Sequence, residues 1–124
     1  MGMYTTLHCR CKVKEEYENE LFRILYFDNE WRKSTIPEIS EFGKDERAFF
    51  ISAILDDEEE HIWIFSADLK NYDNTLEHFI DIVLTKICEE IYELETEYEE
   101  DSSPSIYELL EREIVLVKMG ERDY

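Results

Sequence analysis

Hydrophobic and polar residues alternate from Met3 to Val13, which is the clearest pattern at the start of the chain. A period of two over these eleven residues predicts a strand with one face on a core. Glu15 and Glu16 then begin a predicted helix, because acids in a first turn favour the positive end of the helix dipole. The apolar stripe of this helix has helical spacing and consists of Tyr17, Leu21, Ile24 and Leu25.

The middle of the chain predicts a connection followed by a β-hairpin. Residues 28–46 are mixed in character, and we expect one short helical turn over Pro37–Phe42. The runs Arg47–Leu55 and His61–Leu69 are rich in β-branched and aromatic residues, and five acidic residues separate them. Two such runs around a short polar segment predict an antiparallel hairpin.

A long helix is predicted from Asn74 to the Ser-Ser-Pro sequence at 102–104. Asn74 and Glu77 match a capping box at its start. Two short segments follow the helix, Ser105–Leu110 and Glu113–Lys118, and the second is strongly strand-like. The helical seam, with steps of three and four, consists of Leu76, Ile80, Val83, Ile87, Ile91, Leu94 and Tyr98.

The order of these elements is β-α-β-β-α-β in one domain of residues 1–124, a length that supports a single core. This order predicts the α+β class and, within it, a ferredoxin-like sandwich. In that fold two helices cover one face of a four-stranded antiparallel sheet. The final segments leave open an additional C-terminal hairpin.

Both faces of the predicted hairpin strands carry large apolar residues. If helices cover only one face, residues 47–69 expose apolar side chains such as Phe50 and Ile54 on the other. An exposed patch of that kind marks an interface or a self-association surface. The alternative is that the connection 28–46 or the C-terminal segment covers it.

The charge is strongly acidic and unevenly distributed. Thirteen basic residues face 32 acidic ones, for a net charge of −19, and residues 56–124 carry most of the excess. Such a surface repels nucleic acid and anionic membranes and favours a basic partner. The chain has no apolar run long enough for a membrane span, no secretory leader and three cysteines, so we expect a cytoplasmic protein with reduced thiols.

The cysteines are the first candidates for chemistry. Cys9 and Cys11 share the face of the first strand that carries Leu7, so burial in the core is favoured over metal binding. His8 lies on the opposite face and cannot activate Cys9. Cys88 shows no ligand spacing to them, and the chain lacks phosphate-binding, dinucleotide-binding, hydrolase and metalloprotease motifs. We therefore expect no cofactor, no metal and no enzymatic activity.

The acidic segments are the main candidates for recognition. Eight acids lie between Glu89 and Asp101, where a helix end would place them against its dipole and against one another. They form either a solvated face that maintains solubility or a recognition surface for a basic protein. The hairpin tip repeats the acidity, but it lacks the glycine and spacing of a calcium loop. The candidate partner-binding residues are Glu89, Glu90, Glu93, Glu97, Glu100, Asp101, Asp57, Glu58 and Glu59.

The stretch LKNYDNTLEHFIDIVLTKICEEIYELETEYEE (69–100) resembles small acidic proteins of bacterial conflict systems. These are immunity proteins that neutralise a toxin and phage-borne inhibitors. The resemblance covers size, acidity and strand–helix order over most of the chain, and it carries no functional residue over to any position. It implies one-to-one inhibition of a basic protein, without catalysis.

Three hypotheses follow from the sequence. The leading one is a protein-binding module whose acidic surface engages a basic partner, such as a toxin or a nuclease. The second is a scaffold domain that self-associates, for example as a homodimer, through the apolar sheet face. The third is a small-molecule enzyme.

Overall fold

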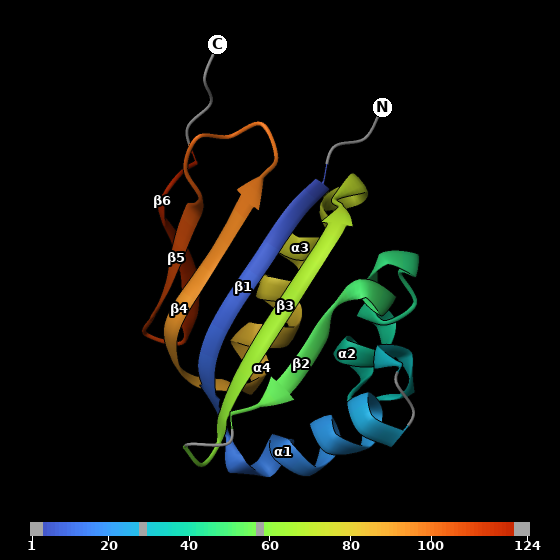
Figure 1. Ribbon diagram of the computed structural model, residues 1–124. Helices are drawn as coiled ribbons and strands as arrows, with labels where there is room; N and C mark the ends of the chain where they lie inside the picture. Colours follow the sequence, from blue (N-terminus) through green and yellow to red (C-terminus); the bar gives the residue numbers. More distant parts are fainter. Residues whose placement is uncertain (1–3, 28–29, 57–58, 121–124) are drawn as a thin grey trace.

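The computed structural model describes residues 4–27, 30–56 and 59–120, which form an antiparallel sheet with helices on one face (Figure 1). In the sheet the strands lie in the order β2-β3-β1-β4-β5-β6. The α+β class is therefore confirmed, but the sheet has six strands where four were expected. The strands are β1 (Tyr4–Val13), β2 (Ser52–Leu55), β3 (Ile62–Lys70), β4 (Cys88–Tyr98), β5 (Ser105–Leu110) and β6 (Glu113–Lys118).

The helices occupy the two long connections of the sheet. In the view of Figure 1, the helix that joins β3 to β4 lies behind β1 and β3. The first connection contains α1 (Glu15–Phe22) with its π-helical continuation η1 (Arg23–Phe27), then η2 (Trp31–Lys33), α2 (Pro37–Phe42) and η3 (Glu46–Phe50). The second contains η4 (Tyr72–Asn74), α3 (Thr75–His78), the π-helical η5 (Phe79–Leu84) and α4 (Thr85–Ile87).

β1 lies at the centre of the sheet between β3 and β4. It is antiparallel to both, and β2 is antiparallel to β3, so β1 and β2 run in the same direction on either side of β3. By the same logic β3 and β4 run in the same direction on either side of β1. The register sets Cys9 opposite Phe65 on β3 and Leu94 on β4, and all three are buried beneath the helices.

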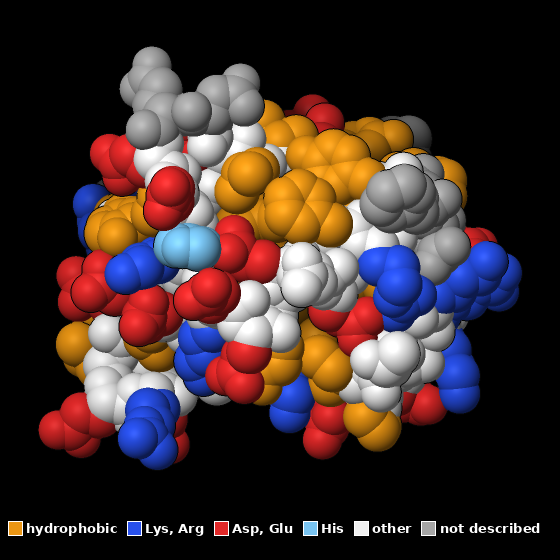
Figure 2. All heavy atoms as spheres, turned by 90° about the horizontal axis from the view of Figure 1, so that it is seen from below, with side chains coloured by type: hydrophobic (Ala, Val, Ile, Leu, Met, Phe, Trp, Pro, Cys, Tyr) orange, Lys and Arg blue, Asp and Glu red, His pale blue; other side chains and the backbone are white. Residues whose placement is uncertain are grey.

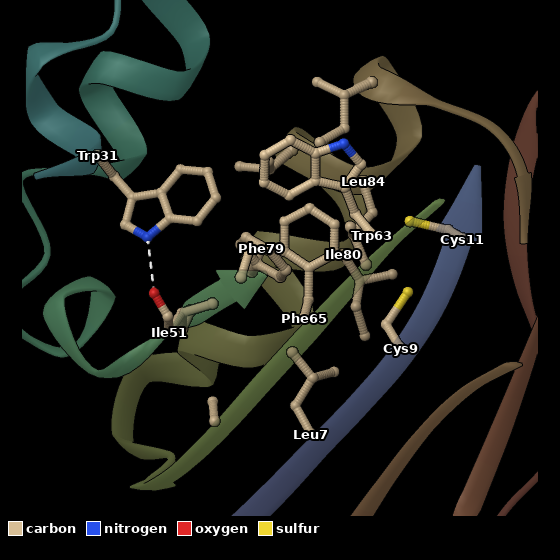
Figure 3. Packing of buried hydrophobic residues seen from close by; sticks show 14 of the residues in the cluster. Leu7, Cys9, Cys11, Trp31, Ile51, Trp63, Phe65, Phe79, Ile80 and Leu84 are labelled. Carbon is tan, nitrogen blue, oxygen red and sulfur yellow. Dashed lines mark hydrogen bonds between the residues drawn. The ribbon is translucent and has the colours of Figure 1, made fainter. Parts of the chain in front are cut away.

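Aromatic side chains form the middle of the core. Trp63, Phe65 and Phe79 are fully buried, and the rings of Phe65 and Phe79 have centroids 5.7 Å apart. Trp31 packs edge-on against Phe79, with centroids 5.3 Å apart. Its Nε1 donates to the carbonyl oxygen of Ile51 at 3.0 Å (dashed line in Figure 3), so the buried indole N–H is satisfied.

The predicted long helix is wrong in its second half. The helix ends at Ile87, and the segment from Cys88 onward is the strand β4. Two register shifts between β1 and β4 explain the misleading pattern, since each inserts an extra residue into β4. They let Cys88, Ile91 and Leu94 share the core-facing side at steps of three, which imitates helical spacing.

Three other local predictions are confirmed, and two differ in detail. The short helix over Pro37–Phe42, the β2–β3 hairpin and the C-terminal β5–β6 hairpin are all present. The first hairpin strand is shorter than predicted, because Asp45 accepts a hydrogen bond from the backbone N–H of Arg47 at 2.7 Å and caps η3 there. The expected cap at Asn74 makes no side-chain bond, and Asn71 instead accepts from the N–H of Leu76 at 2.8 Å.

Candidate protein-binding face

The face of the sheet that points away from the helices carries most of the candidate residues. On β1 the register turns His8, Arg10 and Lys12 toward this open face. On β4 it turns Glu95 and Glu97 the same way, opposite His8 and Thr6. We use "acidic face" for the β4 residues Glu89, Glu90, Glu93, Glu95 and Glu97.

The bases of β1 neutralise part of the acidic face. Lys12 Nζ lies 3.3 Å from Glu89 Oε2, and His8 Nε2 lies 3.4 Å from Glu93 Oε2. The hydrogen bond from Lys12 to Glu89, together with the charge of Glu89, raises the pKa of Lys12. These groups are exposed, so solvent screens the pairs. The acidic segment is thus better compensated than the sequence suggested.

Arg10 neutralises acids from the β2–β3 connection. Its Nη2 lies 3.3 Å from Asp56 Oδ2 and 3.6 Å from Glu59 Oε2, and its guanidinium stacks over the ring of Tyr92, 5.4 Å from the centroid. The candidates Asp57 and Glu58 lie outside the described residues. Glu59 lies outside the acidic face of β4 and contacts Arg10 beside it.

Two acids of this face differ from Glu89 and Glu93 in their contacts. Within the part of the chain that the structure describes, neither Glu95 nor Glu97 has a base within ion-pair distance. Glu90 accepts a hydrogen bond from the Tyr92 hydroxyl at 3.0 Å, and this bond raises the pKa of Tyr92. Side chains two apart on a strand project about 6.7 Å apart on one face, a regular spacing for basic groups of a partner.

The strand conformation changes the interpretation of these acids. Because Glu89–Asp101 does not form a helix end, the expected dipole conflict and i,i+4 repulsion are absent. Glu100 is exposed and Asp101 is half-buried, and both follow the end of β4. Sequence reasoning missed Glu95, which a period of two would have placed beside Glu97.

The three cysteines are buried, and Figure 3 shows Cys9 and Cys11 near each other on the helix-facing side of β1. Cys11 is hydrogen-bonded to Cys9 and Cys88. These bonds and, second, burial raise the pKa of the Cys9 and Cys88 thiols, which keeps both protonated at neutral pH. Among the described residues no group of three His, Cys, Asp or Glu side chains is placed to hold a metal ion.

A carboxylate of α1 forms a contact that no sequence signal indicated. Glu18 accepts from the indole Nε1 of Trp63 at 3.1 Å, and its other oxygen is hydrogen-bonded to the His61 ring. The hydrogen bond between Glu18 and the His61 ring raises the pKa of His61. Figure 2 shows acidic and basic side chains interspersed on the end of the molecule where α1 lies, beside a group of hydrophobic side chains.

The apolar sheet face that the sequence predicted is small. Trp63 and Phe65 lie under the helices, and Ile62 is buried although it belongs to the other register. Ile54 is 56% exposed on this face, while the exposed Phe50 belongs to η3 and not to a strand.

The helical layer contains a groove. It lies between α2 and the η5–α4 helix, has a volume of about 900 Å³, and its polar lining is mainly acidic. Lys86 crosses it to within 3.8 Å of Glu38. Its remaining acids are Glu41, Asp45 and Asp81.

Comparison with protein-family models, curated proteins and solved structures finds no match to this chain. Within the described residues, no helix combines the length and apolarity that crossing a membrane requires.

Proposed function

We propose that the chain is a non-catalytic protein-binding module whose acidic face engages a basic protein. Glu95 and Glu97 carry this proposal, since they stand side by side on an uncovered sheet face and, among the described residues, have no base within ion-pair distance, although His8 lies opposite Glu95 in the register. Glu90 and Glu93 extend the same row along the strand. A toxin or a nuclease is the partner that the acidic character favours, in the manner of an immunity protein or an inhibitor.

The charge of the whole chain adds a long-range component. At a net charge of −19, the chain attracts a basic partner from a distance and speeds the encounter at low salt. The row on β4 then supplies local contacts. Solubility alone would require the net charge but no particular arrangement of the acids, and this difference can be measured.

We infer a finer fold assignment alongside this function. Reading β2-β3-β1-β4 across the sheet, with two crossover connections that carry helices on the same face, supports a ferredoxin-like sandwich with the β5–β6 hairpin added beside β4. In such a sandwich the face opposite the helices stays open. That openness makes the acidic face accessible to a partner.

The test compares two triple variants of equal net charge. One replaces Glu93, Glu95 and Glu97 with Gln on the acidic face. Its matched control replaces Glu38, Glu41 and Glu46 with Gln; all three are exposed and belong to the helical layer. Association with a basic toxin or nuclease encoded beside this chain is measured by surface plasmon resonance at several salt concentrations.

We expect the acidic-face variant to associate on the order of tenfold more slowly at low salt, with a flatter salt dependence. The control should slow only slightly, through the change in net charge. Equal slowing of both variants would show that only net charge matters. Absence of a complex with the neighbouring basic protein would overturn the proposal.

A further inference from the structure

The outer edge of β6 is the feature that the proposed function leaves unused. β6 is the last strand of the sheet, and in the described part of the chain no strand pairs with its outer side. Four consecutive apolar residues, 114–117, lie between Glu113 and Lys118. Leu116 is 44% exposed and Val117 is 47% exposed. Natural edge strands usually carry a charge or a proline near their middle to prevent pairing, and β6 carries its charges only at the ends.

The hairpin geometry determines which backbone groups point outward. Glu111 and Arg112 both have positive φ, 48° and 71°, as the two-residue turns that favour hairpins require. In such a hairpin the flanking pair, Leu110 and Glu113, exchanges both of its hydrogen bonds. Alternate residues of β6 therefore point their N–H and C=O groups away from β5.

These outward residues are Ile114 and Leu116. The register shift of this hairpin falls after Leu116, so the strand is regular over both of them. Each offers one donor and one acceptor to a further strand, in the plane of the sheet. The edge is thus a short regular template for pairing.

We propose that β6 pairs antiparallel with β6 of a second copy of this chain, about a two-fold axis at Val115. This register places Ile114 opposite Leu116 of the second copy. The outward N–H and C=O groups of Ile114 and Leu116 in each strand then hydrogen-bond to those of the other strand. It also brings Glu113 beside the Val117–Lys118 end of the second copy. The strand is complementary in charge to its own antiparallel copy, which is the argument for a second copy over an unrelated strand.

The response to salt distinguishes this dimer from binding to a basic protein. Two copies of charge −19 repel each other, so added salt should strengthen the β6 pairing, whereas it weakens attraction to a basic partner. The β6 edge is also separate from the acidic face of β4. Failure of either proposal leaves the other standing.

The experiment is sedimentation equilibrium over a wide range of protein and salt concentrations. The wild-type chain should reach a dimer that tightens with salt. Leu116→Lys should remain monomeric, and its matched control Ile54→Lys, which puts the same charge on the exposed part of edge strand β2, should dimerise like the wild type. Far-UV circular dichroism and thermal unfolding establish that both variants are folded.

A charge exchange then tests the identity of the partner strand. Glu113→Lys and Lys118→Glu each set like charges together at both ends of the paired strands, and each should weaken the dimer about tenfold. The double variant restores opposite charges and should regain wild-type affinity. A monomer under all conditions, loss of the dimer in Ile54→Lys, or failure of the double variant to recover would each overturn the proposal. Binding of an unrelated extended peptide to monomeric wild-type chain would assign the edge to another partner.

Discussion

Trp63 donates its indole N–H to Oε2 of Glu18 across 3.1 Å, although the two residues are 45 positions apart in the chain. The contact ties α1 to the beginning of β3. Since Trp63 is fully buried and the Glu18 side chain is only 13% exposed, the bond lies largely out of reach of water. We expect it to matter more for stability than the surface ion pairs of the acidic face.

Glu18→Ala should lower the free energy of unfolding by about 1–3 kcal/mol, because it leaves the indole N–H of Trp63 without its acceptor. Glu18→Gln retains an amide oxygen and should lose less. Urea unfolding followed by tryptophan fluorescence measures both. Glu16→Ala, at an exposed position of the same helix, is the control. Equal losses at positions 16 and 18 would contradict the role of this bond.

The His61–Glu18 contact should make stability depend on pH. Because Glu18 raises the pKa of His61 above 6.5 in the folded chain, protonated His61 adds stability that is fully present below the unfolded pKa. That stability is lost as pH rises through the raised, folded pKa. The wild type should therefore exceed His61→Asn in stability by more at pH 6 than at pH 9. Asn is chosen because His61 has a φ of 67°, which Asn tolerates. A pH-independent difference would argue against the contact.

The cysteines should resist labelling in the native protein. Cys9, Cys11 and Cys88 are buried, and raised pKa values keep Cys9 and Cys88 in the unreactive thiol form. A maleimide reagent should modify all three promptly in denaturant and only at the rate of unfolding without it. Mass spectrometry counts the labels at each time. Rapid native modification of any of them would show that the helix-facing side opens locally.

Neutralising the acids at positions 93, 97 and 100 should leave stability nearly unchanged. On a helix end, changing Glu93, Glu97 and Glu100 to Gln would have relieved repulsion and raised stability. In the structure, where Glu93 and Glu97 lie on β4 and Glu100 follows it, the change instead removes the exposed pair between Glu93 and His8, so we expect a shift within about 0.5 kcal/mol. Thermal unfolding at low and high salt measures it. A clear gain at low salt would indicate that repulsion among the acids dominates over their contacts with β1.

Local hydrophobic patterns predicted the elements whose core-facing residues follow the regular spacing of a strand or a helix. The alternation of β1 predicted which side is buried, and Leu21 of α1 and Ile24 of η1 lie in the core, as the apolar stripe of the first predicted helix indicated. The same reasoning was wrong for β4. Its two extra residues space Ile91 and Leu94 three positions apart on the core-facing side, which is the spacing of a helix. Only pairing with β1, a partner far away in the sequence, distinguishes the two conformations.

The candidate site was predictable in composition but not in arrangement. The sequence showed that acids are concentrated between Glu89 and Asp101, but it assigned them to a helix end, whereas the structure places most of them on β4. The sequence could not show that the bases of β1 lie beside them, since Lys12 and Glu89 meet only through the fold. Nor could it show the Glu18 contacts, which depend on where α1 crosses the end of β3.

The central place of β1 has a consequence for the order of folding. β1 pairs on one side with β3 and on the other with β4. The pairing of Thr6 with Glu97 therefore joins two residues that lie far apart in the sequence. Contacts over such sequence separations close large loops and slow the search for the native state. During synthesis β1 therefore leaves the ribosome before β4 and keeps one edge unfilled until β4 has emerged. Folding of the sheet should be a late event that involves β1, β3 and β4 together.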